Sequence, residues 1–301
     1  MALNTLSEIV YLLKDTFLSE AKVIELEIPE STECAFAIQI NPDNAIEAWN
    51  LIHSRIAEIG KYPVIVCDSE YSTTAIDWER SMRNSDFFSR SYYEAEQYEK
   101  EIKYQIDPKS IITRSKSFDI DKYIDESEDF SEYYNKEENL QFLQKELDFT
   151  EESFGKAPKL QEIGIPITEE GKHEYINFQR WLFGWEIANC GYKQEFVLNL
   201  KDWLNAIDLE DFSEDFFSHT HLALVLLTNN SCEILAYIDS YCMLWPGSES
   251  TIALFRKWQD CYEAEIMCLY GKEILLKVSK LPETPEEAFD LAVEHYAFSP
   301  D

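Results

Sequence analysis

CAFAIQINPDNAIEAWNLIHSRIAEIGKYPVIVCD, residues 34–68, holds the pattern that decides the fold class. Its first seven residues have the alternation of a half-buried strand. Residues 41–43 then combine a capping side chain with a proline, which predicts a helix that runs to Gly60. The apolar run 62–68 is typical of a short strand that is buried on both faces. Elements in this order indicate a compact α+β unit.

The same signals recur outward from this stretch. Residues 22–28 predict another strand on the N-terminal side. Near the other end of the chain, Thr284 and Glu287 are spaced as a capping box, which predicts the start of a closing helix. Further strands are expected at 221–228, 264–270 and 274–280, with a hairpin turn around Gly271, and further helices are expected from Ser231 and from Ser250. We therefore expect an α+β fold in which helices flank a mixed sheet.

The middle of the chain differs in character from both ends. Residues 118–153 contain thirteen acidic residues and three lysines, yet they keep several tyrosines and phenylalanines. A purely disordered segment has few aromatic residues, so we expect an inserted set of helices and loops with a mobile acidic portion. The predicted organisation is an N-terminal part of the core (1–68), an acidic insertion (69–169) and a C-terminal part of the core (170–301).

The charge limits the classes of partner. The 301 residues include 58 acidic and 26 basic side chains, which give a net charge of −32. Nucleic acids and anionic membranes would be repelled by such a chain, so neither is expected as a partner. A basic protein is the partner class that the charge favours. The oligomeric state cannot be read from the sequence.

The cysteines and the N-terminus indicate a compartment. Seven cysteines are scattered along the chain, mostly among apolar neighbours, which is typical of reduced core thiols. They show no zinc-ligand spacing, and we predict neither a metal nor a cofactor. Residues 1–20 carry charges inside an apolar pattern, which favours an amphipathic helix over a signal peptide. A cytoplasmic protein of bacterial type is expected.

Two C-terminal stretches carry a family resemblance. ALFRKWQDCYEAEI (253–266) and ILLKVSKLPETPEEAFDLAVEHYAFSPD (274–301) resemble the C-terminal signature of the bacterial family called domain of unknown function 4253. The likeness extends over roughly residues 222–301. The matching residues are Trp258, Tyr262, Ala264, Glu265, Pro282, Thr284, Ala292, Glu294, His295, Tyr296, Phe298, Pro300 and Asp301. The resemblance implies a fold and no activity, because the family has none assigned.

The chain departs from the family pattern at three places. Residues 241–246 replace a G-W-N-x-C-P stretch, Glu263 stands where the family has glycine, and Ser299 stands where it has cysteine. A family site built on the asparagine or the cysteines would be lost here.

The matched residues also suggest a small polar site. We expect Trp258, Glu265, Glu294, His295 and Asp301 to come together, with the chain end folded back beside the tryptophan. Such a site would make the protein an enzyme or a metal-binding protein. The alternative is that His295 is packed at the edge of a core, where its helical spacing places it.

Evidence for an enzyme is otherwise thin in the sequence. No nucleophile elbow and no glycine-rich phosphate loop is present, and the pair His219 and His221, on one face of a strand, arises often by chance. No catalytic constellation is recognised, so whether the protein is an enzyme stays open, and a binding role is favoured.

The binding role centres on the acidic insertion. We expect Asp129, Glu132, Tyr133 and Tyr134 to contact a basic protein, with the tyrosines as anchors and the carboxylates steering the encounter. An immunity protein covers the cationic active site of a nuclease toxin in this way, and carboxylates that mimic nucleic-acid phosphates are a variant of the idea. The alternative is that the charge only keeps the protein in solution.

Overall fold

The structure is a computed structural model of the chain. It describes residues 5–28, 31–67, 78–84, 88, 107–126, 136–159, 172–189, 222–238, 247–270 and 273–298.

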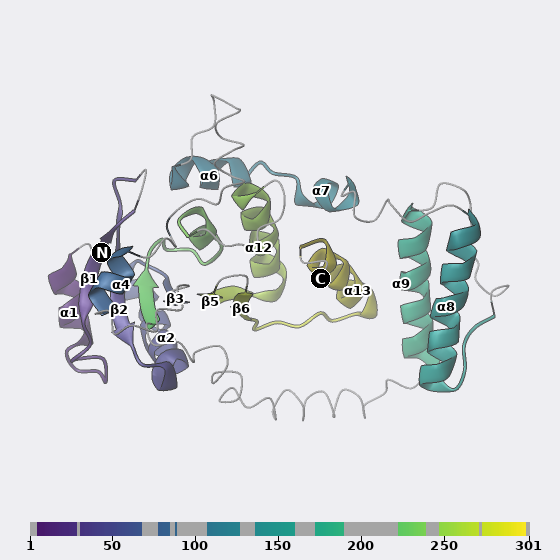
Figure 1. Cartoon of the computed structure of the whole chain (residues 1–301), viewed down its shortest axis with the longest axis horizontal. Helices are drawn as coiled ribbons and strands as arrows, with labels where there is room; N and C mark the ends of the chain where they lie inside the picture. The colour runs from purple at the N-terminus through teal and green to yellow at the C-terminus, as the bar shows by residue number, and fades with distance from the viewer. Residues whose placement is uncertain are drawn as a thin grey trace. The chain divides into compact units, whose positions relative to one another are not determined.

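Six strands among the described residues form one mixed sheet in the order β1-β2-β4-β3-β5-β6 (Figure 1). The β3–β5 pair is parallel and the other neighbours are antiparallel. The strands are β1 (Val23–Glu27), β2 (Cys34–Ile40), β3 (Pro63–Cys67), β4 (Leu222–Leu226), β5 (Glu265–Tyr270) and β6 (Glu273–Lys277). The predicted α+β class with a mixed sheet is confirmed.

Strand β4 joins the two ends of the chain. All five of its residues are buried, and it lies between β2 and β3 in the sheet. Leu226 pairs with Phe36 on one side and with Pro63 on the other. Because β4 comes from the C-terminal third, the central strands of this sheet cannot form from one end of the chain alone.

Several helices accompany the sheet. They are α1 (Leu6–Leu13), α2 (Ala45–His53), α3 (Ile56–Ile59), α4 (Trp78–Asn84), α6 (Pro108–Ser115) and α12 (Ser248–Tyr262), with 3-10 turns η1 (Pro42–Asn44) and η4 (Cys232–Ala236). The predicted cap at residues 41–43 forms, since the Asn41 side chain accepts a hydrogen bond from the Asp43 backbone N–H at 3.1 Å. The single helix expected up to Gly60 is divided into α2 and α3. The helix expected from Ser231 is the short 3-10 turn η4.

The chain divides into two compact units. The first comprises residues 1–120 and 209–281 and contains the whole sheet. The second comprises residues 121–208 and 282–301. Its helices are nearly all of α7 (Ile120–Glu126), together with α8 (Lys136–Phe154), α9 (Lys172–Asn189) and α13 (Pro285–Phe298). The predicted division of the chain at 68/69 and 169/170 stays a prediction.

Helices α8 and α9 pack side by side in the second unit (Figure 1). Leu143 and Leu147 of α8 meet Phe178 and Leu182 of α9 in a buried cluster. Nearer the C-terminal ends of both helices, the Thr150 hydroxyl lies 2.6 Å from a Glu186 carboxylate oxygen. The contacts advance together along the two helices, so the helices run in the same direction.

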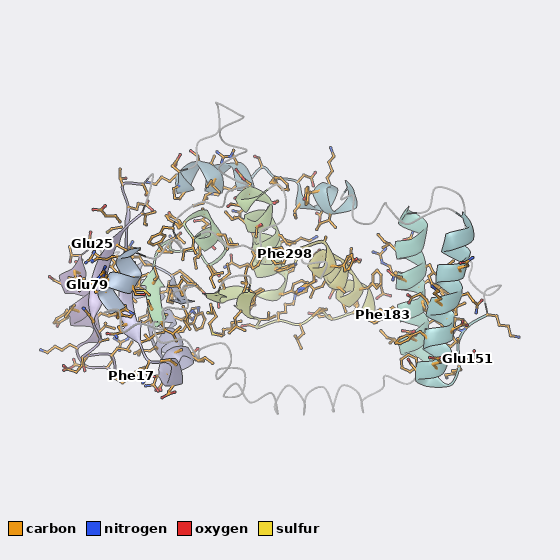
Figure 2. All side chains as sticks on the ribbon, in the orientation of Figure 1. Phe17, Glu25, Glu79, Glu151, Phe183 and Phe298 are labelled. Carbon is orange, nitrogen blue, oxygen red and sulfur yellow. The ribbon has the colours of Figure 1, made fainter. Side chains whose placement is uncertain are left out.

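Helix α13 packs on α9 within the second unit. The rings of Phe183 and Phe289 are 6.0 Å apart, and Figure 2 shows Phe183 on α9. Arg180 lies over the Phe289 ring and forms an ion pair with Asp290. The predicted cap of α13 also forms, because the Thr284 hydroxyl accepts from the Glu287 backbone N–H at 3.1 Å.

Candidate functional site

The glutamate of the family-like stretch contacts a histidine ring within the first unit at hydrogen-bond distance. Glu265 is the first residue of β5, and its Oε1 lies 3.0 Å from Nε2 of His53, the last residue of α2. The two side chains are 23% and 22% exposed, so water reaches the pair from one side. A carboxylate bonded to one ring nitrogen fixes which nitrogen of the imidazole carries a proton, and the pair can therefore accept or donate a proton in a defined direction.

Aromatic rings enclose the imidazole. The His53 ring stacks on Trp49 at 4.3 Å between centroids, and the Tyr62 ring stands edge-on to it at 5.6 Å. Trp49 is held in place because its Nε1 donates to the Pro63 carbonyl at 3.0 Å. Lys277 of β6 lies opposite Glu265 in the strand register and places Nζ 5.3 Å from the centre of the Trp49 ring. We call Trp49, His53, Tyr62, Glu265 and Lys277 the Glu265 cluster.

The Tyr62 hydroxyl is the exceptional group of the Glu265 cluster. Tyr62 is only 2% exposed, and its buried hydroxyl has no hydrogen-bond partner of ordinary geometry in the described part of the chain. Burial raises the pKa of Tyr62, and the Glu265 charge raises it further. The phenol therefore stays protonated. The Ser231 and Glu265 side chains both interact with the phenol, so the hydroxyl has polar neighbours although none meets the geometry of an ordinary hydrogen bond.

The residues of the predicted polar site are divided between the two units. Trp258 lies in α12, is 2% exposed and packs on Phe255 with 5.0 Å between ring centroids. It belongs to the first unit, as Glu265 does, whereas Glu294 and His295 belong to α13 in the second. Asp301 lies outside the described residues. Their assembly into one pocket stays a prediction.

The two α13 residues differ in environment. Glu294 is buried and His295 is exposed, and the packing of His295 at the edge of a core stays a prediction. Partial desolvation nevertheless lowers the pKa of His295, while the neighbouring Glu294 charge acts in the opposite direction. At neutral pH the imidazole is therefore mainly neutral and able to accept a proton.

Sequence reasoning missed most of the Glu265 cluster. His53 looks like a helix-surface residue in the sequence, and Tyr62 looks like the start of a buried strand. The one local signal is the spacing of Trp49 and His53 at i, i+4, which puts both rings on one face of α2. Glu265 follows His53 by 212 positions, so only the fold brings the two together.

The acidic insertion presents a second candidate surface. The predicted contact residues Asp129, Glu132, Tyr133 and Tyr134 lie outside the described residues. Helix α8, however, carries Phe149 with 67% of its surface exposed, although its other side packs on α9. Three exposed acidic residues surround this ring in the sequence, and Figure 2 labels one of them, Glu151, on α8. We call Asp148, Phe149, Glu151 and Glu152 the acidic face of α8.

The described residues include neither a metal-binding group of side chains nor a membrane-spanning helix. Within the described ranges, no three His, Cys, Asp or Glu side chains are grouped so that they could hold a metal ion. His219 and His221 fall outside those ranges. No helix in the described part of the chain has the length and apolar character needed to cross a membrane.

The comparison with protein families agrees with the resemblance in the C-terminal sequence. Residues 222–301 match the model of the family described as Domain of unknown function (DUF4253). The matched segment includes β4, β5, β6, α12 and α13. Two residues of the Glu265 cluster, Glu265 and Lys277, lie within it. No curated protein and no solved structure matches the chain.

One family departure has a structural consequence. Glu263, where the family pattern has glycine, ends α12 in the left-handed conformation with φ of 51°. Helices commonly end on such a residue, and glycine adopts it without strain. The other departures, residues 241–246 and Ser299, lie outside the described residues.

Proposed function

We propose that the chain is a protein-interaction module that binds a basic partner through the acidic face of α8, as an immunity protein binds a cationic toxin. The observation that supports this most directly is the 67% exposure of Phe149 on a helix that also carries the exposed carboxylates Asp148, Glu151 and Glu152. With 67% of its surface exposed, Phe149 contributes little to the packing of α8 on α9. Its burial under a partner would yield about 1.5–3 kcal/mol, and this is the size of contribution that anchors an interface.

The surrounding charges suit a basic partner. Asp148, Glu151 and Glu152 are exposed, and the chain as a whole carries a net charge of −32. Such a field raises the rate at which cationic proteins meet this surface and disfavours acidic ones. The inner side of α8 is fixed by Leu143 and Leu147, so the face is ordered before a partner arrives and less conformational entropy is lost on binding.

We propose a bacterial cytoplasm as the compartment. Cys34, Cys232, Cys261 and Cys268 all carry free thiols, two of them buried and two at least partly accessible. Accessible thiols persist in a reducing compartment and are readily oxidised outside it.

A second candidate function is proton transfer at the Glu265 cluster. The specific observation in its favour is the His53–Glu265 pair next to a buried phenol without a hydrogen-bond partner among the described residues. Acid and base groups held together in this way are typical of catalytic sites and occur in structural networks as well. This candidate requires a small-molecule substrate, whereas the first requires a protein.

A binding experiment with the intact chain distinguishes the two candidate functions. The immobilised protein is exposed to a lysate of the source cell, and a retained protein is identified, purified and titrated against the chain at increasing salt. We expect a basic partner whose association slows as the Debye length falls from about 8 Å at physiological salt toward 3 Å. Phe149→Ala should weaken binding of the purified partner by about tenfold or more.

Two matched controls make the result specific. Tyr11 is 77% exposed on α1, and Tyr11→Ala should leave affinity unchanged. The double change Glu151→Lys with Glu152→Lys should slow association, while Asp15→Lys with Glu20→Lys, which changes the net charge by the same amount on an exposed segment elsewhere, should have a smaller effect. Equal effects of both pairs would reduce the charge to a general property of the surface. Retention of no protein would remove the proposal.

A further inference from the structure

A polar pocket of about 690 Å³ lies in the first unit, whereas the acidic face of α8 belongs to the second. It is found beside the strand ends at which β2 and β3 begin and β4 ends. Phe36 and Pro63 both pair with Leu226, so the chain segments at Cys34 and Lys61 lie on either side of the segment that follows β4. A volume in this range suits a small organic ligand.

Helix α6 contributes one complete face to the pocket wall. Lys109, Ile112, Thr113 and Lys116 all line the pocket, and their spacing of i, i+3, i+4 and i+7 puts them on one side of the helix. A helix that presents its side chains in a row at a cavity supplies a fixed arrangement of charge.

Other residues of α6 hold the helix on α12. Arg114 Nε lies 2.6 Å from Glu249 Oε1, and Arg256 donates to the Ser115 carbonyl at 3.2 Å and to its hydroxyl at 3.0 Å. These bonds involve charged groups on one or both sides, and such bonds are the stronger kind. The lysines of α6 therefore project from a helix that is anchored independently of them.

The charges that line the pocket are unusual for this chain. Three lysines, Lys61, Lys109 and Lys116, face two glutamates, although acidic residues outnumber basic ones by 58 to 26 overall. Each glutamate already has a partner within the pocket. Glu33 accepts from the Tyr237 hydroxyl at 2.8 Å and pairs with Lys109 at 3.1 Å, and Glu233 accepts from the Thr228 hydroxyl at 3.2 Å.

Lys61 and Lys116 keep their charges available. The Lys61 ammonium donates to the backbone carbonyls of Cys34 at 3.3 Å and Leu227 at 3.4 Å, which are neutral acceptors. Neither lysine forms a salt bridge with another described residue. Lys61 also interacts electrostatically with Glu33, so the lining combines three ammonium groups with two carboxylates and with hydroxyl and amide groups from Thr32, Thr113 and Asn229.

We propose that this pocket binds a small phosphate-bearing metabolite, whose phosphate group is held by Lys61, Lys109 and Lys116. Lysine ammonium groups act as separate point charges, which suits a compact phosphate dianion. Carboxylates are commonly bound by arginine through two parallel hydrogen bonds, and the described lining contains no arginine. The net negative charge of the chain does not prevent this, because charges beyond about 8 Å are screened at physiological salt. Hydroxyl and amide groups of the lining are placed to bind the rest of the metabolite.

The test uses the full chain and glucose 6-phosphate as the probe, with binding measured by calorimetry at constant ionic strength. We expect glucose 6-phosphate and inorganic phosphate to bind and glucose to show no binding. The double variant Lys109→Met with Lys116→Met should weaken the binding of glucose 6-phosphate by about tenfold or more. The matched control is Lys14→Met with Lys145→Met, two exposed lysines outside the pocket, and it should bind as the unchanged chain does.

A second measurement needs no variant. Lysine acetylation of the unchanged chain, read by mass spectrometry, should be slowed by glucose 6-phosphate at Lys61, Lys109 and Lys116 and should be unaffected at Lys14 and Lys145. Absence of binding, absence of this protection, or equal weakening in both double variants would overturn the proposal. Tighter binding of citrate than of glucose 6-phosphate would overturn the assignment of phosphate.

Discussion

At the scale of single residues, two buried tyrosines show how the same side chain can serve different ends. Tyr62 and Tyr237 are 2% and 5% exposed. The Tyr237 hydroxyl donates to Glu33 at 2.8 Å, whereas the Tyr62 hydroxyl has no hydrogen-bond partner among the described residues. A buried donor without an acceptor lowers the free energy of unfolding by about 1–3 kcal/mol, so such a group does not stabilise the fold.

This difference leads to a prediction about stability. Tyr62→Phe removes an unsatisfied hydroxyl and should leave the free energy of unfolding unchanged or raise it by about 1 kcal/mol. Tyr237→Phe is the matched control, because it removes a bond to a carboxylate and should lower the free energy of unfolding by about 1–3 kcal/mol. Urea unfolding of the three proteins measures both changes. Equal losses in the two variants would show that Tyr62 has a partner and that the Glu265 cluster is structural.

At the scale of elements, the sequence predicts what depends on local periodicity and capping. The strands at 34–40 and 63–67 and the closing helix from Thr284 follow from alternation, proline position and the capping box. The 3-10 turn after Ser231 does not, because a few apolar residues in a row fit several conformations and the surrounding core decides among them. The break between α2 and α3 near Ser54 could not be predicted for the same reason, because local sequence alone does not decide it.

The sites were harder to predict than the elements. The Glu265 cluster and the lysine pocket each combine residues from distant parts of the chain, and no local pattern records their meeting. The lysines of α6 illustrate the limit: their spacing in the sequence shows that they share a face, but not that a cavity lies in front of it. Conversely, Glu265 could be selected in advance because it belongs to the family-like stretch.

The packing of α8 on α9 gives a prediction that depends on pH. Burial raises the pKa of Glu146, and the negative charge of Glu186 raises it further. An acid whose pKa is higher in the folded state is penalised when it is ionised, so its ionised form destabilises the fold above that pKa. Glu146→Gln should therefore raise the free energy of unfolding at pH 7, and the gain should shrink as the pH falls through the raised pKa of the folded state toward the ordinary value. Thermal unfolding at several pH values measures this.

Asp148→Asn serves as the control for this change. Asp148 is exposed on the same helix, and its replacement removes one negative charge in water. It should have a small effect on unfolding that varies little with pH between 5 and 7, because exposed charges are well screened. A gain at pH 7 from Asp148→Asn as large as that from Glu146→Gln would attribute the effect to net charge and contradict the role of desolvation.

At the scale of the whole molecule, the order of strands explains how the two ends of the chain cooperate. The first three strands come from the N-terminal end and the last three from the C-terminal third, and they alternate at the centre of the sheet in the order β2-β4-β3-β5. Each central strand is thus paired on at least one side with a segment more than a hundred residues away. Part of the predicted insertion belongs to the same unit as the sheet, because Trp78 Nε1 of α4 donates to the Leu222 carbonyl at 3.0 Å and Arg83 donates to the Glu25 carbonyl at 3.1 Å. Helix α8, which carries the exposed Phe149, belongs to the other unit.

Limited proteolysis of the native protein tests this arrangement. We expect the first cuts to fall between residues 105 and 160, because no described residue of this segment belongs to a strand, whereas the four central strands of the sheet are hydrogen-bonded on both sides. The cut chain should elute as one species in size-exclusion chromatography and separate into two fragments only in denaturant, since β4 is paired with β2 and β3 and β3 is paired with β5. A C-terminal fragment that elutes alone and remains folded would contradict the prediction, because it would have to keep β4 stable with both of its partner strands removed.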